Sequence, residues 1–228
     1  MPRIDLVADL GESFGAWTMG ADEAILDLLT SANVACGFHA GDPRTMDLTV
    51  RRCVERGVAI GAHPSFPDVV GFGRRAMDLT ADEVRTDTIY QLGALSAFAA
   101  AHGTTLAHLA PHGRLGNLVA TRPDYAEAVV DAVDAVDPSL VVLAQDGCLA
   151  EAARARGLAV GVVGIADRAY RADGTLVPRS EPDALITDPA AAAAQAARLA
   201  AEVDTLCVHA DTPGALAIAA AVHGALHG

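Results

Sequence analysis

The sequence predicts a single α/β domain over residues 1–228, built as a seven-stranded, imperfect β/α barrel. Short β-branched or apolar runs alternate with helical patterns from end to end, and no segment has the composition of a linker. Polar residues follow the carboxyl ends of the predicted strands, and in a barrel those ends converge on one mouth. The first strand leads into the acidic turn 9–15 instead of the glycine-rich phosphate cradle that is typical of an open, doubly wound sheet.

The strands are predicted from the short β-branched or apolar runs, many of which end at a histidine, an acidic residue or an amide. In chain order they span 4–9, 32–36, 58–63, 106–110, 140–145, 159–165 and 205–209. The residue before a proline favours extended backbone, so Pro64 supports the end of the third strand at His63.

Helical patterns fill the intervals between the strands. They span 22–29, 43–56, 81–102, 123–136, 149–156 and 189–202, and a last helix begins near 213. Three helix starts place a capping side chain before a proline at the first helical position: Asp42-Pro43, Asp188-Pro189 and Thr212-Pro213. Thr80 and Glu83 have the spacing of a capping box. Glycines that are expected to end helices in the left-handed conformation follow three of them: Gly57, Gly103 and Gly157.

The composition excludes several classes of function. All 16 basic residues are arginine, so the chain has no lysine for a Schiff base or for a P-loop. A formal net charge of −13 disfavours a broad nucleic-acid interface, because such interfaces need clustered cations. Hydrophobic residues make up 52% of the chain, which is ample for a core and too high for a disordered chain.

Several features favour a soluble cytoplasmic protein that does not bind membranes. Residues 1–5 lack the apolar stretch of a secretory signal. The alanine-rich run 190–201 is interrupted by Gln195 and Arg198, so a surface or half-buried helix is expected there instead of a membrane span. The four cysteines form no CxxC pair and are expected to be reduced and buried.

Polar residues gather at or just beyond the predicted strand ends. They are Asp9, Glu12, His39, His63, His112, Gln145, Asp146, Asp167, Arg168, His209 and Asp211. A single histidine at such a place is usually structural, but four histidines at one mouth favour a functional site. His108 shares a strand face with His112 and is expected to be a buried neighbour of that site.

Aspartate and histidine at a barrel mouth suit two chemistries, and the residues alone leave the choice open. One is general acid–base hydrolysis, and the other is water activation by a hard divalent metal ion. The adjacent pair Arg74 and Arg75 suits bidentate binding of a carboxylate or phosphate. Pairing of one of these arginines with Asp68 or Asp78 is an equal alternative.

Long motifs resemble those of a known family. They are Asp9-Leu-Gly-Glu-Ser-Phe-Gly15, Ser31-Ala-Asn-Val-Ala-Cys-Gly-Phe-His-Ala-Gly-Asp-Pro43, Gly71-Phe-Gly-Arg-Arg75, Tyr90-Gln-Leu-Gly-Ala-Leu95, Ala166-Asp-Arg-Ala-Tyr170, Val177-Pro-Arg-Ser180 and Cys207-Val-His209. Their order and their extent over nearly the whole chain resemble the LamB/YcsF family. The resemblance implies a barrel of the glycoside hydrolase/deacetylase type.

The resemblance also implies a function. The family comprises the A-type subunit of bacterial 5-oxoprolinase, which with two partner subunits opens the lactam of 5-oxoproline to L-glutamate at the expense of ATP. ATP is therefore the implied cofactor. Because the chain has no P-loop, the nucleotide is expected to be contacted by arginines, backbone amides or a partner subunit.

Carried over residue by residue, the resemblance nominates a set of site residues: Asp9, Glu12, Asn33, His39, Asp42, His63, Arg74, Arg75, His112, Asn117, Asp167, Arg168 and His209. We expect Asp9 or His39 to activate water and His112 or His209 to transfer a proton. Arg74 or Arg75 is expected to bind an anion. Substrate or anion binding is also expected of the remaining polar members, Glu12, Asn33, Asn117, Asp167 and Arg168, while Asp42 is expected to cap a helix.

Several positions depart from the family pattern. Val7 stands for an asparagine, Ala110 for a lysine, Gly116 for a tyrosine, Gly164 for a glutamate and Ala210 for a glycine. Loss of the ammonium at position 110 removes a charge of a kind commonly worth ~3 kcal/mol of barrier when it stabilises an oxyanion. These changes predict a divergent member that keeps the fold and put its full 5-oxoprolinase activity in question.

Two other functions stay open from the sequence. The first is a metal-dependent amidohydrolase or deacetylase, in which Asp9, His39 and His63 hold a divalent ion of unknown identity. The second is a non-catalytic subunit that keeps the barrel and binds partners. Homo-oligomer formation is open as well.

Overall fold

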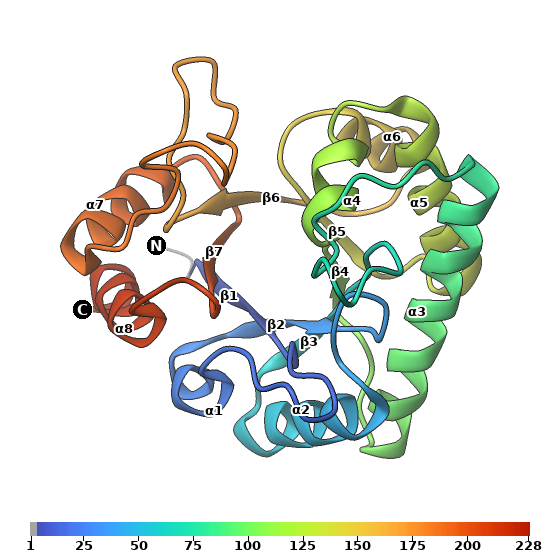
Figure 1. The fold of residues 1–228 in the computed structure, drawn as a ribbon, viewed down its shortest axis with the longest axis horizontal. Coiled ribbons are helices and arrows are strands. Elements are labelled where there is room, and N and C mark those ends of the chain that lie inside the picture. Colours follow the sequence, from blue (N-terminus) through green and yellow to red (C-terminus); the bar gives the residue numbers. More distant parts are fainter. Residues whose placement is uncertain (1–3) are drawn as a thin grey trace.

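Residues 4–228, which the computed structural model describes, form a closed barrel of seven parallel strands (Figure 1). The strands follow one another round the ring in chain order, and the last pairs with the first. The predicted barrel is therefore confirmed. Residues 1–3 of the domain expected over 1–228, which are also part of the N-terminal stretch 1–5, lie outside the described part.

The boundaries of most strands and helices agree closely with those predicted. The strands are β1 (Asp5–Leu10), β2 (Ser31–Ala35), β3 (Ala59–His63), β4 (His108–Leu109), β5 (Val141–Ala144), β6 (Val160–Ile165) and β7 (Thr205–His209). The helices are α1 (Asp22–Ile25), the 3-10 helix η1 (Leu26–Leu28), α2 (Pro43–Arg56), α3 (Ala81–Ala101), α4 (Gly113–Val119), α5 (Pro123–Val136), α6 (Cys148–Arg156), α7 (Pro189–Leu199) and α8 (Ala215–His227). The helical pattern did not predict α4.

The strand register aligns the polar residues at one end of the barrel. Asp9 of β1 is paired with Asn33 of β2 on one side and with His209 of β7 on the other. Deeper in the barrel, Gly61 of β3 faces His108 of β4. Because all the pairings are parallel, the carboxyl ends of the strands open on the same side of the molecule.

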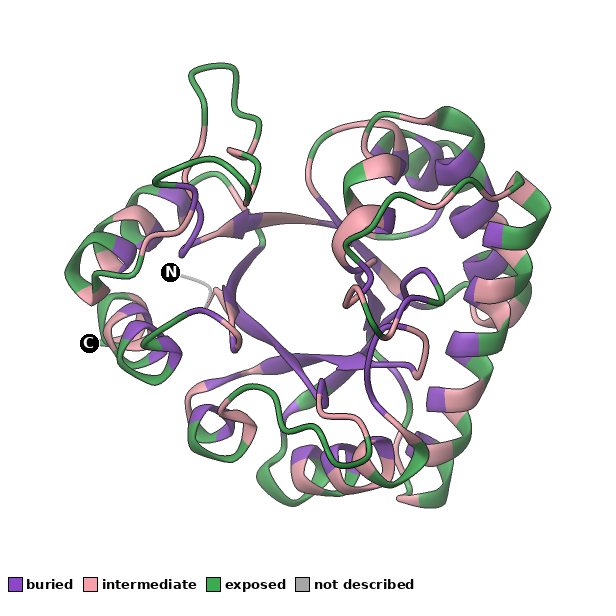
Figure 2. Cartoon of the chain, in the orientation of Figure 1, coloured by how far each residue is buried: buried purple, intermediate pink, exposed green. Residues whose placement is uncertain are grey.

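The helices surround the strands and turn buried faces towards them (Figure 2). Many of the buried residues on these faces are alanines. Helix α7 buries Ala192, Ala196 and Leu199 and packs against α8. Small side chains let helices approach the barrel and each other closely, which explains how a chain with 4% aromatic residues fills its core. Tyr125 is buried on α5, where its hydroxyl donates to the Leu79 carbonyl at 2.6 Å.

Helix capping follows the sequence signals at all but one of the predicted sites. Asp42 caps α2 and Asp188 caps α7, and the capping box of α3 is present. The three predicted terminating glycines all have positive φ. The cap expected at Thr212 is wrong: α8 begins at Ala215. The Thr212 hydroxyl instead donates a hydrogen bond to the Asp167 carboxylate at 2.6 Å, so a long-range contact replaces local capping.

Among the helices of residues 4–228, none has both the length and the hydropathy that a membrane span needs. All four cysteines are free. Three of them are buried as expected, while Cys148 at the start of α6 is only partly buried.

Candidate active site

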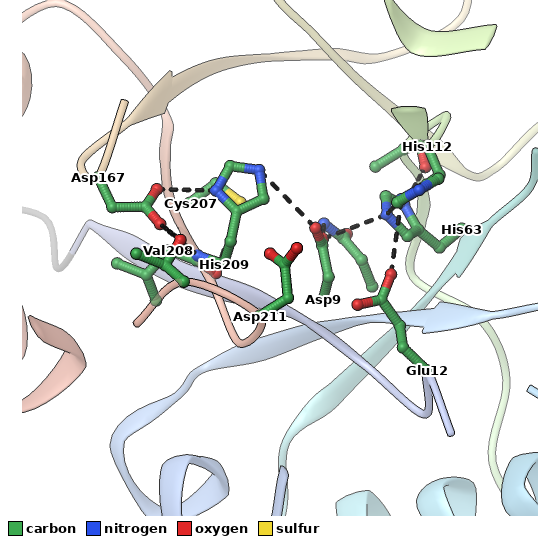
Figure 3. A network of polar contacts seen from close by, with 12 residues as sticks. Asp9, Glu12, His63, His112, Asp167, Cys207, Val208, His209 and Asp211 are labelled. Carbon is green, nitrogen blue, oxygen red and sulfur yellow. Dashed lines mark hydrogen bonds and ion pairs between the residues drawn. The ribbon is translucent and has the colours of Figure 1, made fainter. Parts of the chain in front are cut away.

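A buried cluster of carboxylates and imidazoles lies at the carboxyl ends of the strands (Figure 3). Its members come from five segments of the chain and are at most 5% exposed: Asp9 of β1, Glu12 of the β1–α1 loop, His39 of the β2–α2 loop, His63 at the end of β3 and His112 before α4. The structure thus brings together all five from the positions that the strand ends predicted.

The loop 64–80 covers the imidazoles, and left-handed backbone at two of its residues allows the close approach. Gly73 has φ +65°, and a Cβ there would lie 2.9 Å from His39 Cβ and 2.2 Å from Ser65 Oγ. Its neighbour Phe72 also has a positive φ, 54°, which is uncommon for a large side chain. This conformation lets the Phe72 carbonyl accept a hydrogen bond from His112 Nε2 at 3.0 Å.

Three imidazoles pack against one another under this loop. The rings of His39 and His112 are stacked, with centroids 3.8 Å apart. His63 Nε2 lies 3.0 Å from His112 Nδ1, while His63 Nδ1 donates to the Ala110 carbonyl at 2.5 Å. Glu12 Oε1 lies 3.1 Å from His39 Nε2 and 3.5 Å from His112 Nδ1.

Asp9 occupies the centre of the network (Figure 3). Its Oδ1 accepts from Asn33 Nδ2 at 2.9 Å and lies 3.3 Å from His63 Nε2, while its Oδ2 lies 4.0 Å from His209 Nε2. Burial raises the pKa of Asp9, but the charge and hydrogen bond of His63 and the charge of His209 outweigh burial and hold that pKa well below its usual value. Asp9 is therefore ionised.

Burial favours the neutral forms of three other members of the cluster: Glu12, His39 and His112. Burial, followed by the nearby carboxylates of Asp9 and Asp211, raises the pKa of Glu12 well above its usual value. Burial also lowers the pKa values of His39 and His112, and the other imidazoles add to this effect.

A fourth imidazole, that of His209, is held by a buried aspartate on the far side of Asp9. Asp167 Oδ1 lies 2.7 Å from His209 Nδ1, and Asp167 Oδ2 accepts from the Thr212 hydroxyl. Burial lowers the pKa of His209, but the charge and hydrogen bond of Asp167 raise it to a net value above the usual one. His209 thus directs a protonatable Nε2 towards Asp9, an arrangement that suits a general acid.

Of the two adjacent arginines, Arg74 faces the mouth and Arg75 does not take part in the cluster. Arg74 Nη2 lies 2.7 Å from Asp211 Oδ2, and its guanidinium carbon lies 4.8 Å from the centre of the Phe72 ring. Arg75 pairs with the buried carboxylate of Asp68, its Nε donating at 2.8 Å. One arginine therefore pairs with Asp68, as one of the two alternatives expected.

A further arginine that was not nominated from the sequence also reaches the mouth. Arg179, from the long loop 166–188, lies 3.5 Å from the same oxygen of Asp211. Arg179 belongs to the motif 177–180, which is the feature of the sequence that could have indicated its place in the site. Two guanidiniums on one carboxylate leave a net positive charge at this part of the mouth.

Three other nominated residues have different surroundings. Asn33 lies inside the barrel beside Asp9. Arg168 is buried and donates to the Ala184 and Val177 carbonyls, so it holds the loop 166–188 together. Burial, and then the charge of Arg179, lowers its pKa to about 10. Asn117 is exposed on α4, outside the contacts that build the cluster.

The metal-binding trio expected from the sequence is divided between two groups. His39 and His63 lie with Glu12 and His112, whereas Asp9 lies with Cys207 and His209. In each group the candidate ligand atoms lie within 4.8 Å of one another. Sequence spacing cannot distinguish these groupings, because Asp9 and Glu12 leave the same strand three residues apart.

Three positions that depart from the family pattern lie close to the site or in the barrel that supports it. Val7 is fully buried in β1, two residues before Asp9. The carbonyl of Ala110 accepts a hydrogen bond from His63, and the residue is 9% exposed. At Gly116 a Cβ would lie 2.5 Å from the Pro111 carbonyl oxygen, so a tyrosine there requires a shifted α4.

Asn33 also links the cluster to a buried histidine below it. Its amide donates to Asp9 through Nδ2, so its Oδ1 accepts from His108 Nε2 at 2.8 Å. His108 is 4% exposed, as expected for a buried neighbour of the site. His108 thereby fixes which way the Asn33 amide faces.

Burial of His108 gives a testable dependence of stability on pH. Burial lowers the pKa of His108 to about 4, although Asp5 opposes the shift. In the unfolded chain His108 has an ordinary pKa near 6.5, so the unfolded chain takes up a proton at a higher pH than the folded protein does. The resulting loss of folding stability is absent above pH ~6.5 and grows as the pH falls towards 4. We expect urea unfolding at pH 7.5 and pH 4 to show about 3 kcal/mol more acid destabilisation in the wild type than in His108→Gln. Equal pH slopes for the two proteins would contradict a buried, neutral His108.

Comparison with known proteins places this chain in a family. The LamB/YcsF family model matches residues 4–228. The chain is 52% identical to the A-type subunit of 5-oxoprolinase from Methylococcus capsulatus, over 95% of this chain and 89% of that protein. The lactam utilization protein of Thermus thermophilus has a crystal structure that superposes with a TM-score of 0.93, at 44% identity over 98% of this chain and 96% of that one. A GH113 β-1,4-mannanase, at 12% identity with a TM-score of 0.56 and coverage of 99% of each chain, shares the fold alone.

Proposed function

The chain belongs to the LamB/YcsF family, and on this premise we propose that it is the A-type subunit of a 5-oxoprolinase. With two partner subunits it opens the lactam of 5-oxoproline to L-glutamate in a reaction coupled to ATP hydrolysis. The proposal gives ATP to the assembly as a whole, since this chain has no lysine for a P-loop.

The observation that carries this proposal is geometric: the Asp9 carboxylate and the His209 imidazole face each other at the mouth of the barrel, with Oδ2 and Nε2 4.0 Å apart. Opening a lactam is an amide hydrolysis, so it needs an activated water, a proton for the leaving nitrogen and stabilisation of the oxyanion. Asp9, held ionised, is the group suited to accept a proton from water. His209, whose pKa Asp167 raises, is the group suited to protonate the nitrogen.

The substrate of this reaction carries a carboxylate, and the mouth offers a place for it. Arg74 and Arg179 converge on Asp211, which is 11% exposed on its side chain. A substrate carboxylate that enters beside these guanidiniums gains charge-assisted hydrogen bonds. This assignment replaces Arg75 by Arg179 in the anion-binding role that the sequence suggested.

The direct test is reconstitution of the chain with its two partner subunits and measurement of glutamate released from 5-oxoproline and ATP. Asp167→Asn is expected to lower kcat about 100-fold with little change in KM, because His209 then loses the carboxylate that orients its ring and stabilises its protonated form. Asp204→Asn is the matched control, since Asp204 lies at the opposite end of β7 and accepts from the Val162 amide.

Two results would overturn parts of this proposal. An intact wild-type assembly that releases no glutamate rejects the function, and the non-catalytic role that the changes at Ala110 and Gly116 suggest then takes its place. Full activity of Asp167→Asn rejects the role of His209 as general acid while leaving the function standing.

A further inference from the structure

We propose that Glu12, His39, His63 and His112 bind one divalent transition-metal ion. The four residues are at most 5% exposed and come from four separate loops or strand ends that converge under the loop 64–80. The proposal concerns metal binding itself, so it can be tested without the 5-oxoprolinase reaction.

The spacing of the ligand atoms fits a small ion. His63 Nε2 and His112 Nδ1 are 3.0 Å apart, Glu12 Oε1 and His39 Nε2 are 3.1 Å apart, and Glu12 Oε1 and His112 Nδ1 are 3.5 Å apart. A tetrahedral ion with bonds of about 2.0–2.1 Å holds its ligand atoms about 3.3 Å from one another. Of the three distances, 3.0 and 3.1 Å are shorter than that value and 3.5 Å is longer.

The protons of two histidines support a cation at this point. Backbone carbonyls only accept, so His63 carries a proton on Nδ1 towards Ala110, and His112 carries one on Nε2 towards Phe72. The other two ring nitrogens, His63 Nε2 and His112 Nδ1, lie 3.0 Å apart, and His63 Nε2 also lies 3.3 Å from Asp9 Oδ1. Imidazoles that are anchored to a carbonyl through one nitrogen are common metal ligands through the other.

The surrounding charges agree with this assignment. Glu12 is buried near the carboxylates of Asp9 and Asp211, and a divalent ion bound by Glu12 would offset the repulsion among these groups. Stacked, parallel imidazoles such as His39 and His112 coexist well as neutral ligands, whereas two imidazolium rings at that distance repel each other.

His39 is the weakest of the four proposed ligands. Its Nδ1 has no hydrogen-bond partner among residues 4–228, so no carbonyl fixes its tautomer. To present a lone pair on Nε2 it must place a proton on this unpartnered Nδ1. The structure therefore orders the ligands, with His63 and His112 contributing more affinity than His39.

The donor set narrows the class of ion. Three imidazoles and one carboxylate suit zinc, cobalt, nickel or iron, whereas magnesium and calcium prefer oxygen ligands throughout. Such an ion supplies Lewis acidity towards a carbonyl oxygen or lowers the pKa of a bound water. The alternative group at Asp9 is less suited, because burial raises the pKa of the Cys207 thiol well above its usual value and Asp167, 2.7 Å from His209 Nδ1, raises the pKa of His209.

The test uses the purified full-length chain without substrate. After chelation and dialysis, the protein is titrated with Zn²⁺ and with Co²⁺, and bound metal is measured by elemental analysis, Tm by thermal unfolding and coordination by visible Co²⁺ absorption. We expect one ion per chain, a rise in Tm and an absorption band of imidazole-bound cobalt. His63→Gln and His112→Gln should each weaken metal affinity at least 10-fold, and His39→Gln should weaken it less.

The control is His108→Gln, a buried imidazole below the cluster that is not a proposed ligand. It should retain the wild-type stoichiometry and cobalt spectrum. Absence of bound metal, Tm shift and cobalt band in the wild type overturns the proposal, as does unchanged metal affinity in both His63→Gln and His112→Gln. Loss of the band in Cys207→Ala with retention in His63→Gln also overturns it, since the ion then lies in the other group. None of these results bears on whether the assembly opens 5-oxoproline.

Discussion

Replacing Asp9 by asparagine is expected to lower the turnover of 5-oxoproline by the reconstituted assembly about 1,000-fold or more, since both proton transfer and charge stabilisation depend on this carboxylate. Asp9 lies between two imidazoles of the site, with His63 Nε2 3.3 Å from Oδ1 and His209 Nε2 4.0 Å from Oδ2. Asparagine keeps the shape but loses the negative charge. It also has no basic oxygen of the kind that accepts a proton from water.

The control for this variant is Asp5→Asn, a change of the same type at the other end of the same strand. Asp5 accepts from the Ser31 hydroxyl at 2.8 Å and lies at the opposite end of β1 from the cluster. Thermal unfolding of both variants separates loss of chemistry from loss of fold. Near-normal kcat in a folded Asp9→Asn protein would remove Asp9 from the mechanism and leave water activation to another group.

The sequence predicts the barrel and the members of the site well, because both depend on local patterns. Apolar runs identify the strands, and the polar residue that ends each run identifies the mouth. His63 and His112 could be placed there by strand ends and prolines alone. The capping box at Thr80 and Glu83 is equally local, since both partners belong to one helical turn.

What the sequence does not predict are contacts set by the three-dimensional path of loops. Thr212 looks like a helix cap, but the buried carboxylate of Asp167 competes for its hydroxyl. The sequence does not distinguish Arg74 from Arg75. In the structure the backbone is left-handed at Phe72 and Gly73, and after this turn Arg74 lies at the mouth while Arg75 pairs with Asp68. The grouping of Glu12 with three histidines likewise depends on how that loop folds over them.

Replacing Gly61 by alanine is expected to be the most destabilising small change in the barrel. A Cβ at this position would lie 2.0 Å from Cδ2 and Nε2 of His108, which is buried and hydrogen-bonded to Asn33. Overpacking of this kind costs about 3 kcal/mol, equivalent to a fall in Tm of roughly 10 °C for a chain of this length. Because His108 must move, the Asn33 amide that donates to Asp9 loses its support as well.

Gly93→Ala is the matched control for this change, and the double variant Gly61→Ala/His108→Ala identifies the cause. Gly93 lies in α3 with nothing within 4 Å of an added Cβ, so alanine there should be neutral or stabilise the helix by up to about 1 kcal/mol. If the imidazole is the obstacle, Gly61→Ala should cost far less free energy of unfolding in a His108→Ala background than in the wild type. The same cost in both backgrounds would place the strain elsewhere. A smaller cost, measured by urea unfolding, would show that the missing side chain at position 61 is what allows the barrel to hold His108 beneath Asn33, and through Asn33 the orientation of Asp9.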